Sequence, residues 1–213
     1  MARFEEMSAL LQKGKAKDLV AMIQEELAAG TTAQDILNCS LIEGINVIGE
    51  KFKNNQVFIP EVLITARAMN EALKILRPEL QKTGVEPIGK CIICTVKGDL
   101  HDIGKNLCKI MLEGNGIECV DLGVDAGPDK IVDAIKTSGS KLVCLSSLLT
   151  TTMVNQGTII DAIKAAGLRD KVKIMVGGAP VTQDFADKIG VDAYTDDAAS
   201  AAAKAKELLL AMK

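Results

Sequence analysis

The second half of the sequence alternates short apolar runs with amphipathic segments, and this alternation restricts the fold more than any other feature. Five apolar runs are typical of buried strands, at residues 91–96, 117–122, 142–146, 173–176 and 192–194. Segments of helical period separate or follow them, at residues 104–113, 129–137, 153–166, 182–189 and 198–212. Continuous apolar strands that alternate with helices indicate a parallel sheet covered on both faces. We therefore predict an α/β fold with a flavodoxin-like (Rossmann-type), doubly wound sheet of five parallel strands.

The first 83 residues have a different pattern, because their apolar residues recur at the spacing of amphipathic helices. Gly30 followed by Thr31 and Thr32 is typical of the end of one helix and the N-cap of the next. The sequence predicts four helices that form an all-α bundle, a cap domain over residues 1–83. Residues 84–89 contain Gly and Pro without periodicity, so we expect a linker there and the α/β domain over residues 90–213. The apolar stripes that mark the helices lie within residues 4–11, 19–27, 37–52 and 62–76.

Composition excludes several classes of protein. Apolar residues make up 48% of the chain, yet Lys, Asp, Glu or Gly interrupts every candidate run of 18, so no transmembrane helix is expected. The N-terminal residues lack the apolar core of a secretory signal. A net charge of −3, with 2% aromatic residues and no Trp, argues against nucleic-acid binding. We expect a cytoplasmic globular protein with neither membrane nor nucleic-acid partners.

The six cysteines predict buried apolar positions rather than a chemical site. Cys91 and Cys94 form a CxxC, but a strand sends positions three apart to opposite faces. No second CxxC follows, and the chain has one histidine. We therefore interpret these cysteines as structural.

The loops at the strand ends contain the candidate chemistry, since doubly wound sheets bind ligands there. The first, third and fourth strands are followed by residues 97–106, 146–152 and 177–180, which should meet at one edge. Neither a P-loop motif nor a GxGxxG motif is present, and the third strand is not followed by the Asp of a response-regulator receiver. The sequence therefore argues against a P-loop nucleotide-binding protein, a dinucleotide-binding protein and a response-regulator receiver.

His101 lies in the pattern Asp99-x-His101-x-x-Gly104. A lone loop histidine is often only a surface or packing residue, but Asp99 can accept a hydrogen bond from the imidazole and hold one tautomer, as happens behind metal-bound histidines. Gly104 leaves room for a bulky ligand near the backbone. One His with dispersed cysteines cannot form a zinc site. It can supply one axial ligand to a metal held within a macrocycle.

These residues resemble the DxHxxG signature of cobalamin-binding domains, together with an SxL element at Ser146 and Leu148 and a GG element at Gly177 and Gly178. The run GEKFKNNQVFIPEVLITARAM, residues 49–69, resembles the helical cap of methyl-transferring corrinoid proteins. The chain is thus similar to the stand-alone corrinoid subunit of methyltransferase systems for methylamines, quaternary amines, methanol or methoxyaromatics. It also resembles the cobalamin module of methionine synthase.

The resemblance implies that cobalamin binds base-off, with its nucleotide tail in a deep slot and His101 as the lower ligand of cobalt. Asp99 would hydrogen-bond the other ring nitrogen, and Thr152 stands where methionine synthase has a serine that completes the relay. A competing interpretation of Thr151 or Thr152 is a helix cap, and of the GG pair a tight turn. The remaining implied cofactor-binding residues are Gly98, Leu100, Asp102, Gly104, Ser146, Leu148, Thr150, Gly177, Gly178 and Ala198, with Phe58 as the candidate that covers the upper face of cobalt.

The resemblance also implies the reaction and the partners. Cob(I)alamin would take a methyl group from a substrate:corrinoid methyltransferase and become methylcobalamin. A methylcorrinoid:acceptor methyltransferase would then pass the group to tetrahydrofolate or a thiol. A reductive activase would serve as a third partner. The chain alone is not expected to be catalytic.

Other functions remain open at this point. The DxHxxG domain also occurs in the cobalamin-binding subunits of adenosylcobalamin-dependent mutases, which generally lack such a cap. Light sensors carry a cap but add a DNA-binding domain. A flavodoxin-like signalling module without a cofactor is the alternative from a different class.

Overall fold

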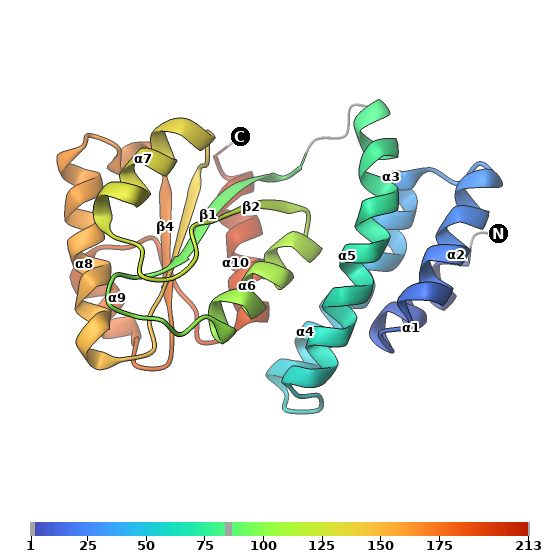
Figure 1. Ribbon diagram of the computed structural model, residues 1–213, viewed down its shortest axis with the longest axis horizontal. Coiled ribbons are helices and arrows are strands. Elements are labelled where there is room, and N and C mark those ends of the chain that lie inside the picture. Colours follow the sequence, from blue (N-terminus) through green and yellow to red (C-terminus); the bar gives the residue numbers. More distant parts are fainter. Residues whose placement is uncertain (1–2, 84–86, 213) are drawn as a thin grey trace. The chain divides into compact units, whose positions relative to one another are not determined.

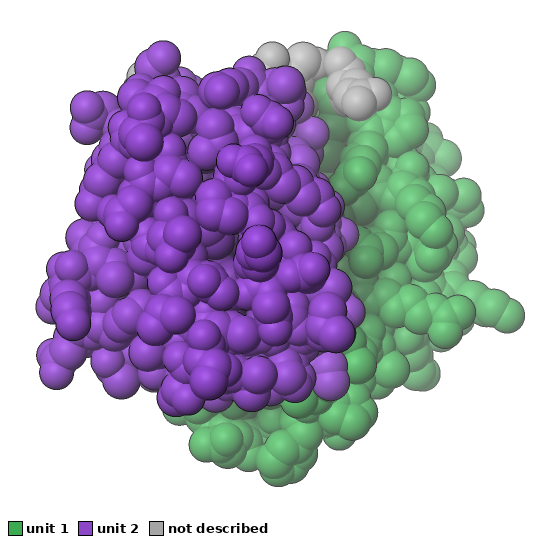
Figure 2. All heavy atoms as spheres, turned by 60° about the vertical axis from the view of Figure 1, so that its left-hand side comes forward, with its two compact units in different colours: residues 1–86 green, residues 87–213 purple. Residues whose placement is uncertain are grey.

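The computed structural model describes residues 3–83 and 87–212. The chain divides into two compact units, Met1–Glu86 and Pro87–Lys213, which are coloured separately in Figure 2. The predicted linker, residues 84–89, lies partly outside the described residues. Its last residue, Gly89, begins the first strand.

The first unit is entirely helical, as the apolar spacing predicts. Its core consists of residues from every helix, including the fully buried Leu11, Leu19, Ile36 and Leu76. Thr32 forms the predicted N-cap, because its Oγ1 accepts a hydrogen bond from the Asp35 N–H at 3.0 Å. The elements are α1 (Phe4–Gln12), α2 (Ala16–Ala28), α3 (Ala33–Ile36), η1 (Leu37–Ile42), α4 (Glu43–Lys53) and α5 (Ile59–Lys82).

The helix expected over residues 37–52 differs from the prediction in one respect. The helical segment runs from Ala33 to Lys53, and its middle turn, η1, is a π-helix. Within η1, the Ser40 hydroxyl donates to the Ile36 carbonyl and competes with the backbone donors there. Apolar spacing contains no signal for such a local change of period.

The second unit contains the predicted parallel sheet of five strands. The strand order is β2-β1-β3-β4-β5, the flavodoxin-like order, and every neighbouring pair is parallel. The strands are β1 (Gly89–Thr95), β2 (Ile117–Asp121), β3 (Leu142–Ser146), β4 (Lys173–Gly177) and β5 (Ala193–Tyr194). Five helices and one 3-10 turn connect or follow them: α6 (Ile103–Gly114), α7 (Pro128–Ser138), α8 (Thr150–Ala165), η2 (Arg169–Lys171), α9 (Gln183–Ile189) and α10 (Ala198–Leu210).

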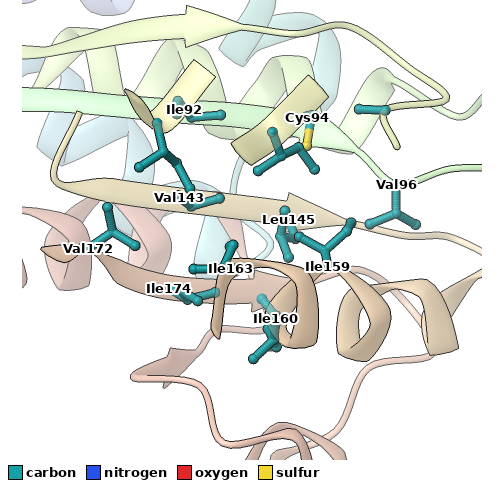
Figure 3. Close-up of a cluster of buried hydrophobic side chains, with 14 of the residues drawn as sticks. Ile92, Cys94, Val96, Val143, Leu145, Ile159, Ile160, Ile163, Val172 and Ile174 are labelled. Carbon is teal, nitrogen blue, oxygen red and sulfur yellow. The ribbon is translucent and has the colours of Figure 1, made fainter. Parts of the chain in front are cut away.

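Helices cover both faces of this sheet. Within the second unit, α7 and α8 lie on one side of the strands, and α6 and α10 lie on the other (Figure 1). Figure 3 shows the α7/α8 side, where Ile92, Cys94 and Val143 from the strands pack against Ile159 and Ile160 of α8. Both faces are apolar, which explains why the strands read as continuous apolar runs.

The predicted burial of the cysteines is confirmed for Cys91, Cys94 and Cys144, whereas Cys39, Cys108 and Cys119 are half-buried. All six are free, and Cys91 and Cys94 are fully inaccessible on opposite faces of β1. Burial raises the pKa of the Cys94 thiol to about 12, so it stays protonated and unreactive at neutral pH.

Among the described residues, every helix is too short or too polar to cross a lipid bilayer.

The packing of Cys94 predicts the effect of a polar replacement. Cys94→Ser places an unpartnered hydroxyl in the apolar cluster, and we expect it to lower the free energy of unfolding by roughly 1–3 kcal/mol. Cys119→Ser is the matched control, because Cys119 is half-buried and its Sγ lies within 4.0 Å of two carbonyl oxygens. Denaturant unfolding measures both. Equal losses would contradict the apolar role of Cys94.

Candidate functional site

The register of the sheet brings the three predicted loop segments to one edge. Thr95, the last residue of β1, pairs with Ser146 at the end of β3, and Ser146 pairs with Gly177 at the end of β4. The DxHxxG motif follows Thr95, and the SxL and GG motifs begin at Ser146 and Gly177 themselves. They therefore start side by side, as the convergence of parallel strand ends requires.

Asp99 joins two of these segments. One carboxylate oxygen, Oδ1, accepts hydrogen bonds from the His101 N–H at 3.0 Å and lies 2.7 Å from His101 Nδ1. The other, Oδ2, accepts from the Leu148 N–H at 2.8 Å, the Leu149 N–H at 3.4 Å and the Thr152 hydroxyl at 2.6 Å. The side chain of Asp99 has no accessible surface. A single buried carboxylate thus binds the first motif to the second.

These contacts fix the charge of Asp99. Burial alone would raise the pKa of its carboxyl, but the hydrogen bonds from Thr152, Leu148 and His101 outweigh it and hold that pKa well below the usual range. Asp99 is therefore ionised at neutral pH and acts only as an acceptor. The hydrogen bond between the two side chains therefore uses the Nδ1 proton of the imidazole, because the Asp99 carboxylate has no proton to donate.

The imidazole ring of His101 is both held in place and accessible. Its side chain is 50% exposed, although Asp99 beneath it is fully buried. In the described part of the chain, Nε2 of His101 has no hydrogen-bond partner. With Nδ1 bonded to Asp99, Nε2 of this exposed imidazole is the nitrogen left for a metal, which is the arrangement of a metal ligand supported by a carboxylate.

Thr152 lies in the first turn of α8 and not at its N-cap. The helix begins at Thr150, three residues before the predicted start, and Leu149 is the N-cap residue. Thr152 is 6% exposed, and its hydroxyl also lies 3.0 Å from the Leu149 carbonyl. The capping interpretation of Thr151 and Thr152 is therefore wrong for this structure.

Gly178 brings the third motif close to the second. Its φ is +123°, and a Cβ at this position would lie 1.8 Å from the Ser147 carbonyl oxygen. Gly177 leaves less room for a ligand than expected, because a Cβ there would lie 3.2 Å from the Thr195 carbonyl oxygen. The tight-turn reading of the GG pair holds for Gly178, since no side chain fits beside Ser147.

The remaining predicted residues surround this cluster or lie apart from it. Leu100, Asp102, Gly104, Leu148 and Thr150 are exposed, Ser146 is half-buried at the strand end, and the Gly98 N–H donates to the Asp125 carboxylate at 2.7 Å. A Cβ on Gly104 would meet nothing within 4 Å, so the space beside it is open. Ala198 is the buried first residue of α10, outside these contacts. Phe58 belongs to the first unit, where it is 65% exposed, and its predicted role at cobalt stays a prediction.

Three further residues of the site were not found from the sequence. The Thr95 hydroxyl donates to the His101 carbonyl at 2.9 Å. Asp125 has φ +52°, accepts from Gly98, and donates its own N–H to the Asp99 carbonyl at 3.1 Å. The Gln156 Nε2 lies 3.2–3.3 Å from Leu145 O, Ser147 Oγ and Gly177 O. None belongs to a motif, and only the contacts of the folded chain indicate their roles.

The donor set fits a metal that arrives with most of its ligands. Among residues 3–83 and 87–212, no three His, Cys, Asp or Glu side chains gather as a ligand set. His101 offers one nitrogen, and bare backbone at Gly104 leaves room for a large ring. In the same described part, Gln156 Oε1 is buried without a hydrogen-bond partner, so it is available to a donor group of a ligand.

Comparisons with known proteins agree with this geometry. A B12 binding domain model matches residues 89–204, and a second one matches residues 3–77. The chain is 41% identical to the trimethylamine corrinoid protein of Methanosarcina barkeri, over 98% of this chain and 99% of that protein. A crystal structure of a cobalamin-binding protein from Desulfitobacterium hafniense DCB-2 matches with a TM-score of 0.83 at 28% identity, over 98% of this chain and 99% of the other. A chain of the methanol:cobalamin methyltransferase complex MtaBC from Methanosarcina barkeri matches with a TM-score of 0.82 at 28% identity, over 95% and 78%.

The close approach at Gly178 predicts a large effect of a methyl group. Gly178→Ala must displace the Ser147 carbonyl, and we expect it to lower the free energy of unfolding by about 3 kcal/mol or more. Gly139→Ala is the control, because Gly139 has φ +70° with open space around it, so only the conformational cost of about 1 kcal/mol applies. Denaturant unfolding of both variants provides the measurement. Similar losses would show that the contact with Ser147 is not restrictive.

Proposed function

Because the chain belongs to the family of B12-binding corrinoid proteins, we propose that it carries methyl groups on a corrinoid whose cobalt is ligated by His101. The corrinoid is bound base-off in this proposal, with its nucleotide tail inside the second unit. The observation that supports the proposal best is the pair Asp99–His101, since the carboxylate holds Nδ1 and leaves Nε2 for the metal.

The residues at the strand ends support a slot for the tail. Ser146 ends β3, and Leu148 and Thr150 follow it up to the start of α8. Gly177 ends β4, and Gly178 follows it. Gln156 contacts both strand ends, and its unpartnered Oε1 suits a hydroxyl donor such as that of a ribose. Asp102 and Leu100 flank His101 in this assignment, and Ala198 stays a prediction for the far end.

The corrinoid supplies a cobalt ion that accepts a methyl group and gives it up again. The protein controls the ligand beneath that ion. Ionised Asp99 keeps the proton on His101 Nδ1, so Nε2 is free to bind. When Nε2 is not bound, the hydrogen bond from Nδ1 to the carboxylate 2.7 Å away still holds the ring in place. Thr152 and the Leu148 N–H maintain the charge of Asp99 throughout.

The partners follow from the need to load and unload the methyl group. We propose a substrate:corrinoid methyltransferase as donor, consistent with the match to a chain of a methanol:cobalamin methyltransferase complex. The 41% identity to a trimethylamine corrinoid protein favours a methylamine as the methyl source. The acceptor enzyme passes the methyl group to tetrahydrofolate or a thiol. A reductive activase reduces oxidised cobalt back to cobalt(I). The match of a B12 binding domain model to residues 3–77 favours this carrier over the mutase subunits, which generally lack the cap.

Removal of the imidazole tests the ligand assignment. We expect His101→Ala to leave the cofactor-free protein folded, to weaken cobalamin binding at least about tenfold, and to abolish the absorption bands of histidine-ligated cobalamin. Added imidazole should restore those bands in the loaded variant, because it can occupy the vacated position. Thermal unfolding of the cofactor-free protein serves as the control for folding. An unchanged spectrum in His101→Ala would refute the assignment.

Dependence on partners tests the carrier role. The purified chain loaded with cobalamin and reduced should not demethylate trimethylamine or methanol at a useful rate, because in this proposal the substrate methyltransferase activates the substrate. Addition of the cognate substrate methyltransferase should start transfer to cobalt, seen as the appearance of the methylcobalamin spectrum. Rapid turnover by the chain alone would overturn the carrier proposal.

A further inference from the structure

Thr95 contacts the histidine loop from outside every recognised motif. It ends β1, it has no accessible surface, and its Oγ1 donates to the His101 carbonyl oxygen at 2.9 Å. Its main-chain groups are used elsewhere: its N–H donates to Gly123 O and its carbonyl accepts from Ala126 N, both at 3.0 Å. The hydroxyl is thus the part of Thr95 that reaches the loop carrying His101.

The sheet itself does not require this hydroxyl. Val has the same shape and is equally suited to a strand, and the other inner residues of β1, such as Ile92 and Ile93, are apolar. A buried hydroxyl costs free energy unless it is hydrogen-bonded. The bond to His101 compensates this cost, so the choice of Thr over Val is explained by the loop.

The loop needs support because it has no regular secondary structure of its own. Residues 99–102 are neither helix nor strand, and Leu100 is 72% exposed. The main chain of His101 is held on one side by its N–H bond to Asp99 Oδ1 and on the other by the bond from Thr95. Together these bonds fix the peptide planes before and after His101, which sets the direction of its side chain. The contact of Nδ1 with Asp99 then fixes the rotation of the ring.

We propose that Thr95 is a positioning residue for His101, and that its hydroxyl holds the imidazole in the orientation in which Nε2 binds cobalt. This inference rests on the proposed function and adds Thr95 to the site. Thr95 touches neither Nδ1 nor Nε2 and acts only through the backbone of His101. Its loss should therefore leave the proton on Nδ1 and change the population of ligated histidine.

The first measurement uses the cofactor-free protein. His101 is the only histidine of the chain, so labelling with carbonyl-¹³C histidine gives one NMR resonance from this site. Thr95→Val should move that resonance upfield because the carbonyl loses its donor, whereas Thr95→Ser should leave it near the wild-type position. Thr65→Val is the matched control, since Thr65 is also fully buried and its hydroxyl donates to a carbonyl, Gln12 O at 3.3 Å.

The second measurement uses the protein loaded with cobalamin and reduced to cobalt(II). In protein labelled with ¹⁵N-histidine, an axial imidazole from His101 splits the electron paramagnetic resonance lines of cobalt(II) into doublets. The unlabelled base of the cofactor itself would give triplets, so the fraction of ligated histidine can be counted from the doublets. Thr95→Val should lower the ratio of ligated to unligated protein about fivefold at neutral pH, as the loss of one hydrogen bond of about 1 kcal/mol predicts. Thr95→Ser and Thr65→Val should keep the wild-type ratio within about twofold.

Each outcome decides the question. A carbonyl resonance unchanged in Thr95→Val would overturn the hydrogen bond, and a shifted resonance with an unchanged ratio would overturn the positioning role. Absence of the ¹⁵N doublet in the labelled wild-type protein would overturn the axial-ligand proposal and this inference with it, while the carbonyl shift would still be seen, so the two failures are distinguishable. If Thr95→Val does not fold, Thr95→Ser and Thr95→Ala provide the same comparison, since they differ only in the hydroxyl.

Discussion

The hydrogen bonds to the Asp99 carboxylate hold the functional edge of the second unit together. A fully buried charge is costly unless it is hydrogen-bonded, and here the donors come from the His101 loop, the residues after β3 and the first turn of α8. Hydrogen bonds to a charged group contribute roughly 1.5–3 kcal/mol each, about twice the value of neutral ones. Because the donors belong to separate segments, the carboxylate stabilises their mutual placement as well as its own charge.

That arrangement depends on the register of the sheet. Thr95, Ser146 and Gly177 are neighbours across three parallel strands, so a shift of one residue would turn every following loop to the wrong side. The apolar side chains of β1 and β3 determine this register, since both faces of the sheet are covered. Gly178 then allows the third segment to approach Ser147 more closely than any side chain would permit. The core of the unit thus specifies the site even though no core residue belongs to it.

The sequence predicted the second unit well because its signals are long and repeated. Alternation of apolar runs and amphipathic segments predicted the strands and their order, and the resemblance to cobalamin-binding domains implied that Asp99 interacts with His101 and Thr152. The start of α8 and the π-helical turn at Leu37–Ile42 were not predicted, since both depend on the local hydrogen bonds that backbone carbonyl groups accept. Thr95, Asp125 and Gln156 were also missed. Their side chains act on main-chain groups of distant segments, and a pattern of residue types along the chain carries no trace of such contacts.

The contrast between Asp99 and His101 has a physical reason. A ligand nitrogen must be accessible, and His101 is half-exposed, but an accessible loop without secondary structure has many conformations to lose on binding. Placing the fixed groups below the surface removes that cost in advance: Asp99 and Thr95 are inaccessible, and both bond to His101. In the proposed function, the imidazole would bind and leave cobalt while its backbone stays in place, because the bonds that orient it do not involve Nε2. An exposed imidazole held by the buried residues Asp99 and Thr95 therefore combines accessibility with a low cost of reorganisation on binding.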